Sequence, residues 1–300
     1  MLKHLLLLCG LATAHPLTAQ LVTTALRINQ HAGHDTVLHF VVPEGESQQV
    51  LMRVAGPALG AFGLTALQDP ALELFRGGVL LGSNDNWGAD NADALRQAFL
   101  QVGAFQFLNN SRDAALLATL APGDYTLRSY SVDTGGGMIL PELYSVTGAG
   151  FSGLSVSTYV EEDSLHLGVL AAPGTYLLRS RSSSIHGAGN AHLQNYESAA
   201  QNDNWTSSAD AAAILAAGAQ LGLPPLGDLD AALLVETLRT GVLNVIASNR
   251  GTPDLVSLDL SFVPPPVAVP VPEPGTYGLG AVGLALALMA RRARRQRPSA

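Results

Sequence analysis

The strongest constraint on the fold is an internal repeat. The stretch Asn-Asp-Asn-Trp occurs at 84–87 and again at 202–205, an offset of 118 residues. Asp-Ala-Ala-Leu-Leu occurs at 113–117 and at 230–234, an offset of 117. Two copies whose offset slips by a few residues indicate two similar structural units that differ in loop length. We therefore expect two tandem domains that meet near 147–153.

The expected domains cover residues 20–148 and 149–262. A looser match supports this division, because residues 50–63 (VLMRVAGPALGAFG) align with 176–189 (YLLRSRSSSIHGAG) at an offset of 126. The joining stretch Gly-Ala-Gly-Phe-Ser-Gly, 148–153, fits the G-x-G-x-x-G pattern literally. A dinucleotide site needs a strand before this pattern and a helix after it. Here strands of two separate copies flank it, so we interpret it as a flexible linker.

The hydrophobic pattern within each copy predicts mostly short strands. The runs HDTVLHFVVP (34–43) and QQVLMRVAG (48–56) alternate or are continuously apolar, and turn residues bound them. Gly77-Gly78 between two apolar runs predicts a hairpin. Strands are expected again from Asp113 onward. The expected fold class is all-β, with two tandem β-sandwich, jelly-roll-like domains and a C-terminal transmembrane helix.

One short helix is expected inside each copy. The first is indicated by apolar residues at helical spacing, namely Ala92, Leu95, Phe99 and Val102. The second is indicated by apolar residues that can share a helical face, namely Ala211, Ile214, Leu215 and Leu221. Ser208 is the expected N-cap of the second helix. Gly218 falls on the same face and weakens that helical pattern.

Charge is unevenly distributed along the chain. Residues 20–262 hold ten arginines, no lysine and 23 acidic residues, a net charge of −13. Phosphates repel such a body, so we expect no nucleic-acid partner. The single cysteine, Cys9, lies in the N-terminal segment, which excludes thiolate zinc sites and disulfides from the mature chain.

The N-terminal segment has the order of features of a secretory signal peptide. Lys3 precedes an apolar run, Leu5 to Ala14, and small residues follow at Ala12, Ala14 and Ala19. We expect residues 1–19 to direct export through the secretion translocon and to be removed. A buried N-terminal strand is the alternative.

The C-terminal segment combines a spacer, an apolar stretch and a basic end. Residues 263–275 are rich in proline, which can continue neither a helix nor a central strand. Residues 276–290 carry no charge and are expected to form a transmembrane helix. Fifteen residues at ~1.5 Å each reach ~22 Å, short of a ~30 Å hydrocarbon core. The arginine-rich tail, 291–300, would remain cytoplasmic by the positive-inside rule.

This segment closely resembles the PEP-CTERM sorting signal of Gram-negative bacteria. The resemblance rests on Pro272-Glu273-Pro274, the apolar stretch after it, and the basic membrane stop formed by Arg291, Arg292, Arg294 and Arg295. It implies recognition by an exosortase, removal of the tail, and release or attachment at the cell surface. Such proteins are often linked to exopolysaccharide and biofilm. A plain tail anchor is the alternative.

The body resembles the bacterial pre-peptidase C-terminal domain. The resemblance rests on a hairpin with Leu72, Leu74, Phe75, Gly78 and Asn84-Asp85, followed by a strand with Leu120, Gly123 and Tyr125. It implies a jelly-roll-like accessory or binding module, sometimes with calcium, and no catalysis. The second copy departs from the pattern, because Val242-Leu243 replaces Asp124-Tyr125.

The repeated Asn-Asp-Asn-Trp motif has two interpretations. Carboxylate and amide oxygens suit calcium, which takes six to eight oxygen ligands. The calcium candidates are Asp69, Asn84, Asp85 and Asn86 in the first copy, and Asn202, Asp203 and Asn204 in the second. In the structural interpretation, which we favour, Asn and Asp close a turn and Trp caps the core. No other cofactor is expected.

The patterns of common hydrolases are absent from the sequence. There is no H-E-x-x-H near His31 and His34, and there is no G-x-S-x-G elbow. Glu161 and Glu162 are adjacent, so on a strand they point to opposite faces and cannot converge on one bond. We expect a non-enzymatic protein at the cell surface or in the extracellular matrix. The alternatives are a carbohydrate- or calcium-binding adhesion module and an accessory protein of an exported hydrolase.

Overall fold

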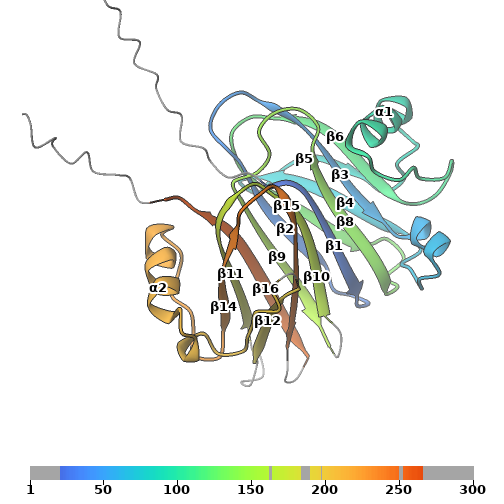
Figure 1. The fold of residues 1–300 in the computed structure, drawn as a ribbon. Helices are drawn as coiled ribbons and strands as arrows, with labels where there is room; N and C mark the ends of the chain where they lie inside the picture. Colours follow the sequence, from blue (N-terminus) through green and yellow to red (C-terminus); the bar gives the residue numbers. More distant parts are fainter. Residues whose placement is uncertain (1–20, 162–163, 184–189, 197, 250–252, 266–300) are drawn as a thin grey trace, which may run out of the picture. The chain divides into compact units, whose positions relative to one another are not determined.

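The computed structural model describes residues 21–161, 164–183, 190–196, 198–249 and 253–265 (Figure 1). The signal peptide, the expected membrane helix, the arginine-rich tail and most of the proline-rich spacer lie outside these residues. Within them, no helix is both long enough and apolar enough to cross a membrane. The described part is all-β with two short helices, which confirms the predicted fold class at that level.

The first repeat contains eight strands, one α-helix and one 3₁₀ helix. Its elements are β1 (Leu21–Gln30), β2 (Thr36–Val42), β3 (Gln48–Ala55), η1 (Pro57–Phe62), β4 (Pro70–Arg76), β5 (Val79–Asn84), α1 (Ala92–Val102), β6 (Ala114–Leu120), β7 (Gly123–Ser131) and β8 (Gly137–Ser145). The hairpin predicted at Gly77-Gly78 joins β4 to β5. Both glycines have positive φ, 55° and 80°, as this tight turn requires.

The second repeat contains the same succession of strands. Its elements are β9 (Gly153–Val160), β10 (Ser164–Ala171), β11 (Gly174–Ser183), β12 (Ala191–Asn195), β13 (Gln201–Asn202), η2 (Trp205–Ser207), α2 (Ala211–Gln220), β14 (Ala231–Thr237), β15 (Gly241–Asn249) and β16 (Asp254–Val263). Both predicted helices are present. The cap prediction was wrong, because α2 begins after Asp210, and Ser208 accepts a hydrogen bond from the Asp210 N–H.

Each repeat is an antiparallel sandwich of two four-stranded sheets. In the first repeat the strand orders are β1-β8-β3-β6 and β2-β7-β4-β5. In the second they are β9-β16-β11-β14 and β10-β15-β12-β13. With the strands of each repeat counted from one to eight, both repeats read 1-8-3-6 and 2-7-4-5. This is the two-sheet arrangement of a jelly roll.

The two sandwiches are merged rather than separate. β1 pairs with β10 and β2 pairs with β9, so that two continuous eight-stranded sheets cross the repeat boundary. The described residues up to Pro264 accordingly cluster as one compact unit. The expected division at 148/149 falls in the connection between β8 and β9. Edge strands of one repeat leave backbone groups unpaired, and the edges of the other repeat satisfy them.

The connection at 148–153 is ordered, in contrast to the expected flexible linker. Phe151 is fully buried and pairs with Leu21 through two backbone hydrogen bonds of 2.9 Å. The Gln48 side chain donates to the Gly150 carbonyl at 2.8 Å and accepts from the Gly150 N–H at 3.2 Å. One hydrophobic core passes between the two sheets and includes residues of both repeats, such as Leu26 and Leu258.

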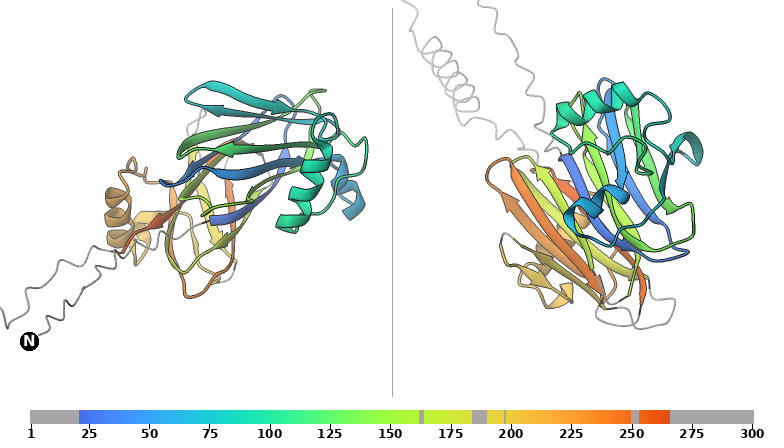
Figure 2. Two further views of the ribbon diagram at one scale, coloured as in Figure 1. Left: turned by 90° about the horizontal axis from the view of Figure 1, so that it is seen from above. Right: turned by 90° about the vertical axis from the view of Figure 1, so that its right-hand side faces the viewer.

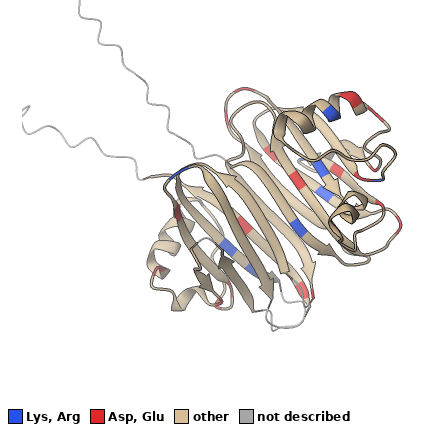
Figure 3. Ribbon diagram, turned by 45° about the vertical axis from the view of Figure 1, so that its right-hand side comes forward, with Lys and Arg blue, Asp and Glu red and all other residues tan. Residues whose placement is uncertain are grey.

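The helices cover opposite layers of the sandwich. α1 contacts β6, and α2 contacts β11 and β14, which belong to the other sheet (Figures 1 and 2). The 1-8-3-6 halves of the two repeats belong to different eight-stranded sheets. Each helix covers the 1-8-3-6 half of its own repeat. No helix among the described residues covers the other two halves. Charges of both signs are interspersed on the face visible in Figure 3.

Candidate functional site at the repeat junction

The repeated Asn-Asp-Asn-Trp motif holds a loop against the next strand. Asn84 accepts a hydrogen bond from the Ala115 N–H at 2.9 Å and donates to the Asn86 carbonyl at 3.2 Å. Asn202 does the same with the Ala232 N–H, at 3.3 Å, and the Asn204 carbonyl, at 3.2 Å. The first Asn of each motif therefore clamps the turn to β6 or β14.

The tryptophan of each motif is a core residue with a satisfied indole. Trp87 is fully buried and Trp205 is 9 % exposed. Their indole N–H groups donate to the carbonyls of Leu108, at 3.1 Å, and Gly227, at 2.9 Å. A buried indole needs such a partner. The repeated motif therefore closes a turn and anchors the helix-bearing loop, as the structural interpretation predicts.

The calcium candidates are engaged elsewhere or lie at the surface. The Asp69 carboxylate pairs with Arg112 at 2.9 Å, and Asp85 is exposed. Asn86 and Asp203 are half-buried, and the Asn204 side chain accepts from the Thr206 N–H at 3.2 Å. Among the described residues, no three His, Cys, Asp or Glu side chains gather as a metal site would require.

A different cluster of polar groups lies where the repeats join. Arg27 of β1 and His166 of β10 are register partners across the junction, and the Arg27 guanidinium donates to His166 Nε2 at 3.0 Å. Their neighbours Leu26 and Leu167 point into the core, so Arg27 and His166 lie on the outer face of the sheet.

These side chains border an open pocket of about 470 Å³. Its lining includes Leu140 of β8, Gly168 of β10, Tyr196 and Asn244. Tyr196 follows β12 and is 67 % exposed to solvent. Its backbone N–H donates a hydrogen bond to the Asn244 carbonyl at 2.9 Å. We call this pocket the junction groove.

The Arg27 guanidinium is the one charged group that lines the described groove. Burial, with the nearby Arg27 charge as the second cause, lowers the pKa of His166 below its ordinary value. Because a guanidinium can only donate, His166 Nε2 accepts from Arg27, and Ser164 Oγ lies 2.8 Å from the same nitrogen. The Arg27 guanidinium and the Tyr196 hydroxyl provide hydrogen-bond donors beside apolar lining residues such as Leu140 and Ile246. The groove suits a neutral or anionic polyhydroxyl ligand.

Sequence reasoning missed the junction groove. The alternation of apolar and polar residues around Arg27 and His166 places each side chain on an outer face. Their pairing depends on two strands separated by 139 residues, which alternation does not reveal.

The histidines singled out in the sequence form an aromatic contact at the end of β9. His34 stacks on Tyr159 with ring centroids 4.0 Å apart, and His31 contacts the same ring edge-on at 5.4 Å. His31 Nδ1 also lies 3.6 Å from a carboxylate oxygen of Glu161. The three groups tie the β1–β2 turn to β9.

Comparison with known proteins identifies the C-terminal segment. The PEP-CTERM protein-sorting motif matches residues 270–295, which contain the Pro272-Glu273-Pro274 motif and four of the terminal arginines. No curated protein matches the chain. The resemblance of the body to pre-peptidase C-terminal domains stays a prediction.

Three solved structures are distantly similar. The Sulfolobus turreted icosahedral virus structure is 13 % identical and covers 92 % of this chain and 99 % of that chain, with a TM-score of 0.21. The STIV MCP (12 % identity, 83 % and 99 % coverage) and the Penaeus vannamei nodavirus (10 %, 83 % and 98 %) both have TM-scores of 0.20. TM-scores this low do not establish a shared fold. What the comparisons do establish is that the chain carries a PEP-CTERM protein-sorting motif, which implies export and an exosortase as its processing partner.

Proposed function

We propose that this chain is an exported, non-enzymatic protein that an exosortase sorts to the cell surface or the extracellular matrix. The observation that carries the proposal is the sorting motif at 270–295. The N-terminal pattern of a signal peptide supports entry through the secretion translocon. The tail then holds the protein in the inner membrane until it is processed.

The non-enzymatic part of the proposal rests on the geometry of the titratable groups. The buried carboxylates of the body are committed to structural partners: Glu142 pairs with Arg53 at 3.1 Å, and Asp113 accepts from the Gly56 N–H at 2.8 Å. In the junction groove, His166 is held by Arg27 and Ser164, and no carboxylate lines the described pocket. General acid–base catalysis needs a titratable group positioned toward a substrate.

We propose further that the junction groove contacts extracellular polysaccharide. The exposed ring of Tyr196 beside the Arg27 guanidinium presents a flat apolar surface next to a charged hydrogen-bond donor. Sugar rings have complementary faces, with C–H groups on one side and hydroxyls at the edge. The net charge of −13 in the body makes a neutral sugar, or one whose anionic groups meet Arg27, the favoured partner.

The sorting proposal is tested by the intact mass and C-terminus of the protein purified from fractionated host cells. We expect the mature protein to lack everything after about Pro274. A variant with Glu273→Ala should keep the tail and accumulate in the inner membrane. An intact arginine tail on the unmodified protein in the inner membrane would contradict sorting and leave a membrane-tethered periplasmic module.

The polysaccharide proposal is tested by binding of purified protein to the host exopolysaccharide and to a glycan array. We expect Tyr196→Ala and Arg27→Ala to weaken binding at least fivefold. Arg239→Ala is the matched control, since Arg239 is an exposed arginine in the turn between β14 and β15. Equal loss in the control would indicate charge-driven adsorption, and unchanged binding in both groove variants would rule out the groove.

A further inference from the structure

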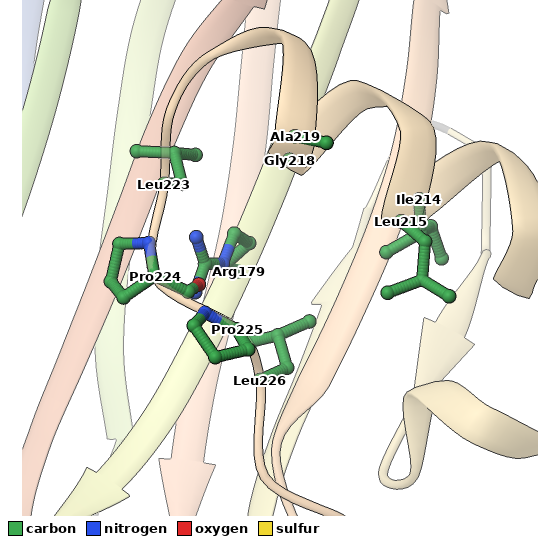
Figure 4. A pocket seen from close by; sticks show the side chains of 9 residues that line it. All are labelled: Arg179, Ile214, Leu215, Gly218, Ala219, Leu223, Pro224, Pro225 and Leu226. Atoms are coloured by element: carbon green, nitrogen blue, oxygen red, sulfur yellow. The ribbon is translucent and has the colours of Figure 1, made fainter.

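The two repeats differ most under their helices. An apolar pocket of about 170 Å³ lies beneath α2, and a buried arginine, Arg179 of β11, contributes to its wall. Figure 4 shows Arg179 beside Pro224 and Pro225 at one end of the pocket, with Ile214 and Leu215 of α2 at the other. Arg179 is only 2 % exposed, although a charged side chain is rarely buried without a paired charge.

In the first repeat, aromatic side chains surround the arginine that corresponds to Arg179. Arg53 of β3 is fully buried, and its guanidinium carbon lies within 4.1–4.6 Å of three aromatic ring centroids. These rings belong to Phe99 of α1 and to Phe105 and Phe107 of the loop after it. The guanidinium is enclosed on its faces by π-systems, a favourable arrangement for a desolvated cation.

Equivalent hydrogen bonds to backbone carbonyls align the two sites residue by residue. Arg53 donates to the Phe105 carbonyl at 2.9 Å, and Arg179 donates to the Pro224 carbonyl at 2.7 Å. The bond from Ala104 N–H to the Phe99 carbonyl has its counterpart from Leu223 N–H to the Gly218 carbonyl, both 2.9 Å long. The two arginines differ by 126 residues, whereas the corresponding positions of the helix and the loop after it each differ by 119.

The same offset continues to the tryptophan contact, where the Leu108 carbonyl corresponds to the Gly227 carbonyl. The three phenylalanines around Arg53 therefore correspond to Gly218, Pro224 and Leu226, and all three of these line the pocket. The largest change is Phe99 to Gly218, which removes a whole ring from the face of the guanidinium.

The missing side chain at Gly218 leaves a space that is large enough for an aromatic ring. A Cβ built on Gly218 meets no atom within 4 Å. The pocket volume of about 170 Å³ is close to the ~150 Å³ of an engineered apolar cavity that binds benzene. Leu215, which lines the pocket, is 52 % exposed, so a ligand can enter beside it.

The charge balance also differs between the repeats. Arg53 Nε lies 3.1 Å from a carboxylate oxygen of Glu142, its register partner on β8. The register partner of Arg179 is Asp259, whose carboxylate instead contacts Arg181 at 3.0 Å and accepts from Ser155 at 2.6 Å. Arg179 Nε, like Arg53 Nε, has no hydrogen-bond partner among the described residues. In the part of the second repeat that the structure describes, Arg179 thus has neither the aromatic rings nor the direct ion pair that Arg53 has in the first repeat.

We propose that the pocket beneath α2 binds a small molecule with one planar aromatic ring, which stacks on the Arg179 guanidinium where Phe99 stacks on Arg53. The ring is held between Ile214 and Leu226, and its face is toward the cation. An aromatic ring is favoured over an aliphatic one because a π-system compensates the desolvated charge and an aliphatic ring does not. This difference strengthens binding by about tenfold. The site is independent of the sorting tail and of the junction groove.

The experiment uses the purified full-length chain and three probes: phenol, indole and cyclohexanol. Binding is measured by isothermal titration calorimetry and by ligand-observed NMR. We expect phenol or indole to bind at least fivefold more tightly than cyclohexanol, which matches phenol in size and hydroxyl group but has no π-system. Equal binding of phenol and cyclohexanol, or no binding of either aromatic probe, would overturn the proposal.

Two variants locate the site. Gly218→Phe restores the residue of the first repeat, fills the pocket with a covalent ring and should abolish aromatic binding. Ala216→Phe is the matched control, because it adds the same ring at an exposed position of the same helix and should leave binding unchanged. Unchanged binding in Gly218→Phe, with an intact far-UV circular dichroism spectrum, would place the ligand elsewhere and refute the assignment.

Discussion

Phe99→Gly tests how much the aromatic enclosure of Arg53 contributes to the fold. The substitution makes the first repeat resemble the second at this position. Phe99 is fully buried and lies 5.7 Å from Trp87, 5.2 Å from Phe107 and 4.4 Å from the Arg53 guanidinium, measured to ring centroids. Removing a buried phenylalanine side chain costs about 3–5 kcal/mol. Glycine in a helix interior costs about 1 kcal/mol more than alanine.

The expected loss of unfolding free energy is therefore about 4–6 kcal/mol. It is measured by urea denaturation followed by tryptophan fluorescence and circular dichroism. Leu100→Gly is the control, since Leu100 is the next residue of α1 and is 65 % exposed. The control should lose only the helix-propensity part, about 1 kcal/mol. A loss for Phe99→Gly no larger than that of Leu100→Gly would refute the reasoning that the ring stabilises the buried cation.

Three further predictions follow. In an NMR titration, the pKa of His166 should lie below its ordinary value, and Arg27→Ala should raise it only in part, because burial is the larger cause. Asn84→Ala should destabilise the protein by about 1–3 kcal/mol in urea denaturation, because it leaves the buried Ala115 N–H without its acceptor. Burial raises the pKa of Glu142, so the folded state holds this proton more tightly than the unfolded chain. Its contribution to stability therefore falls as pH rises through the interval between the two pKa values, and Glu142→Gln should flatten that part of the stability–pH curve.

Local patterns in the sequence determined much of the fold. Alternating apolar residues predicted the strands, Gly77-Gly78 predicted the hairpin with two positive φ angles, and helical spacing predicted both α1 and α2. The repeat predicted two similar units, and the strand orders of the two halves are the same. The sorting motif was also legible, because its three parts are contiguous. All of these features depend on residues close together in the chain, where turn chemistry and side-chain periodicity act directly.

One local motif, the Pro-Gly-x-Tyr turn, recurs in the second repeat at a position that the comparison of the two copies did not match. Tyr125 donates to the Ala121 carbonyl, and Tyr176 donates to the Ala172 carbonyl, each at 2.8 Å and four residues back. The Pro-Gly-x-Tyr turn thus occurs in both repeats but on different strands, β7 and β11. Comparing Tyr125 only with Leu243 suggested that the second repeat had lost this feature.

Tertiary structure alone decided how the repeats join and where their candidate sites lie. The backbone bonds between β1 and β10 merge two sandwiches, and they bring Arg27 to His166 across 139 residues. Such pairing uses peptide groups that every residue carries, so no side-chain pattern encodes it. The pocket at Arg179 likewise needed the fold, because Gly218 in the sequence is only a weak helix residue. Only the fold shows that Gly218 lies beside the buried Arg179 guanidinium, at the position where the first repeat has Phe99.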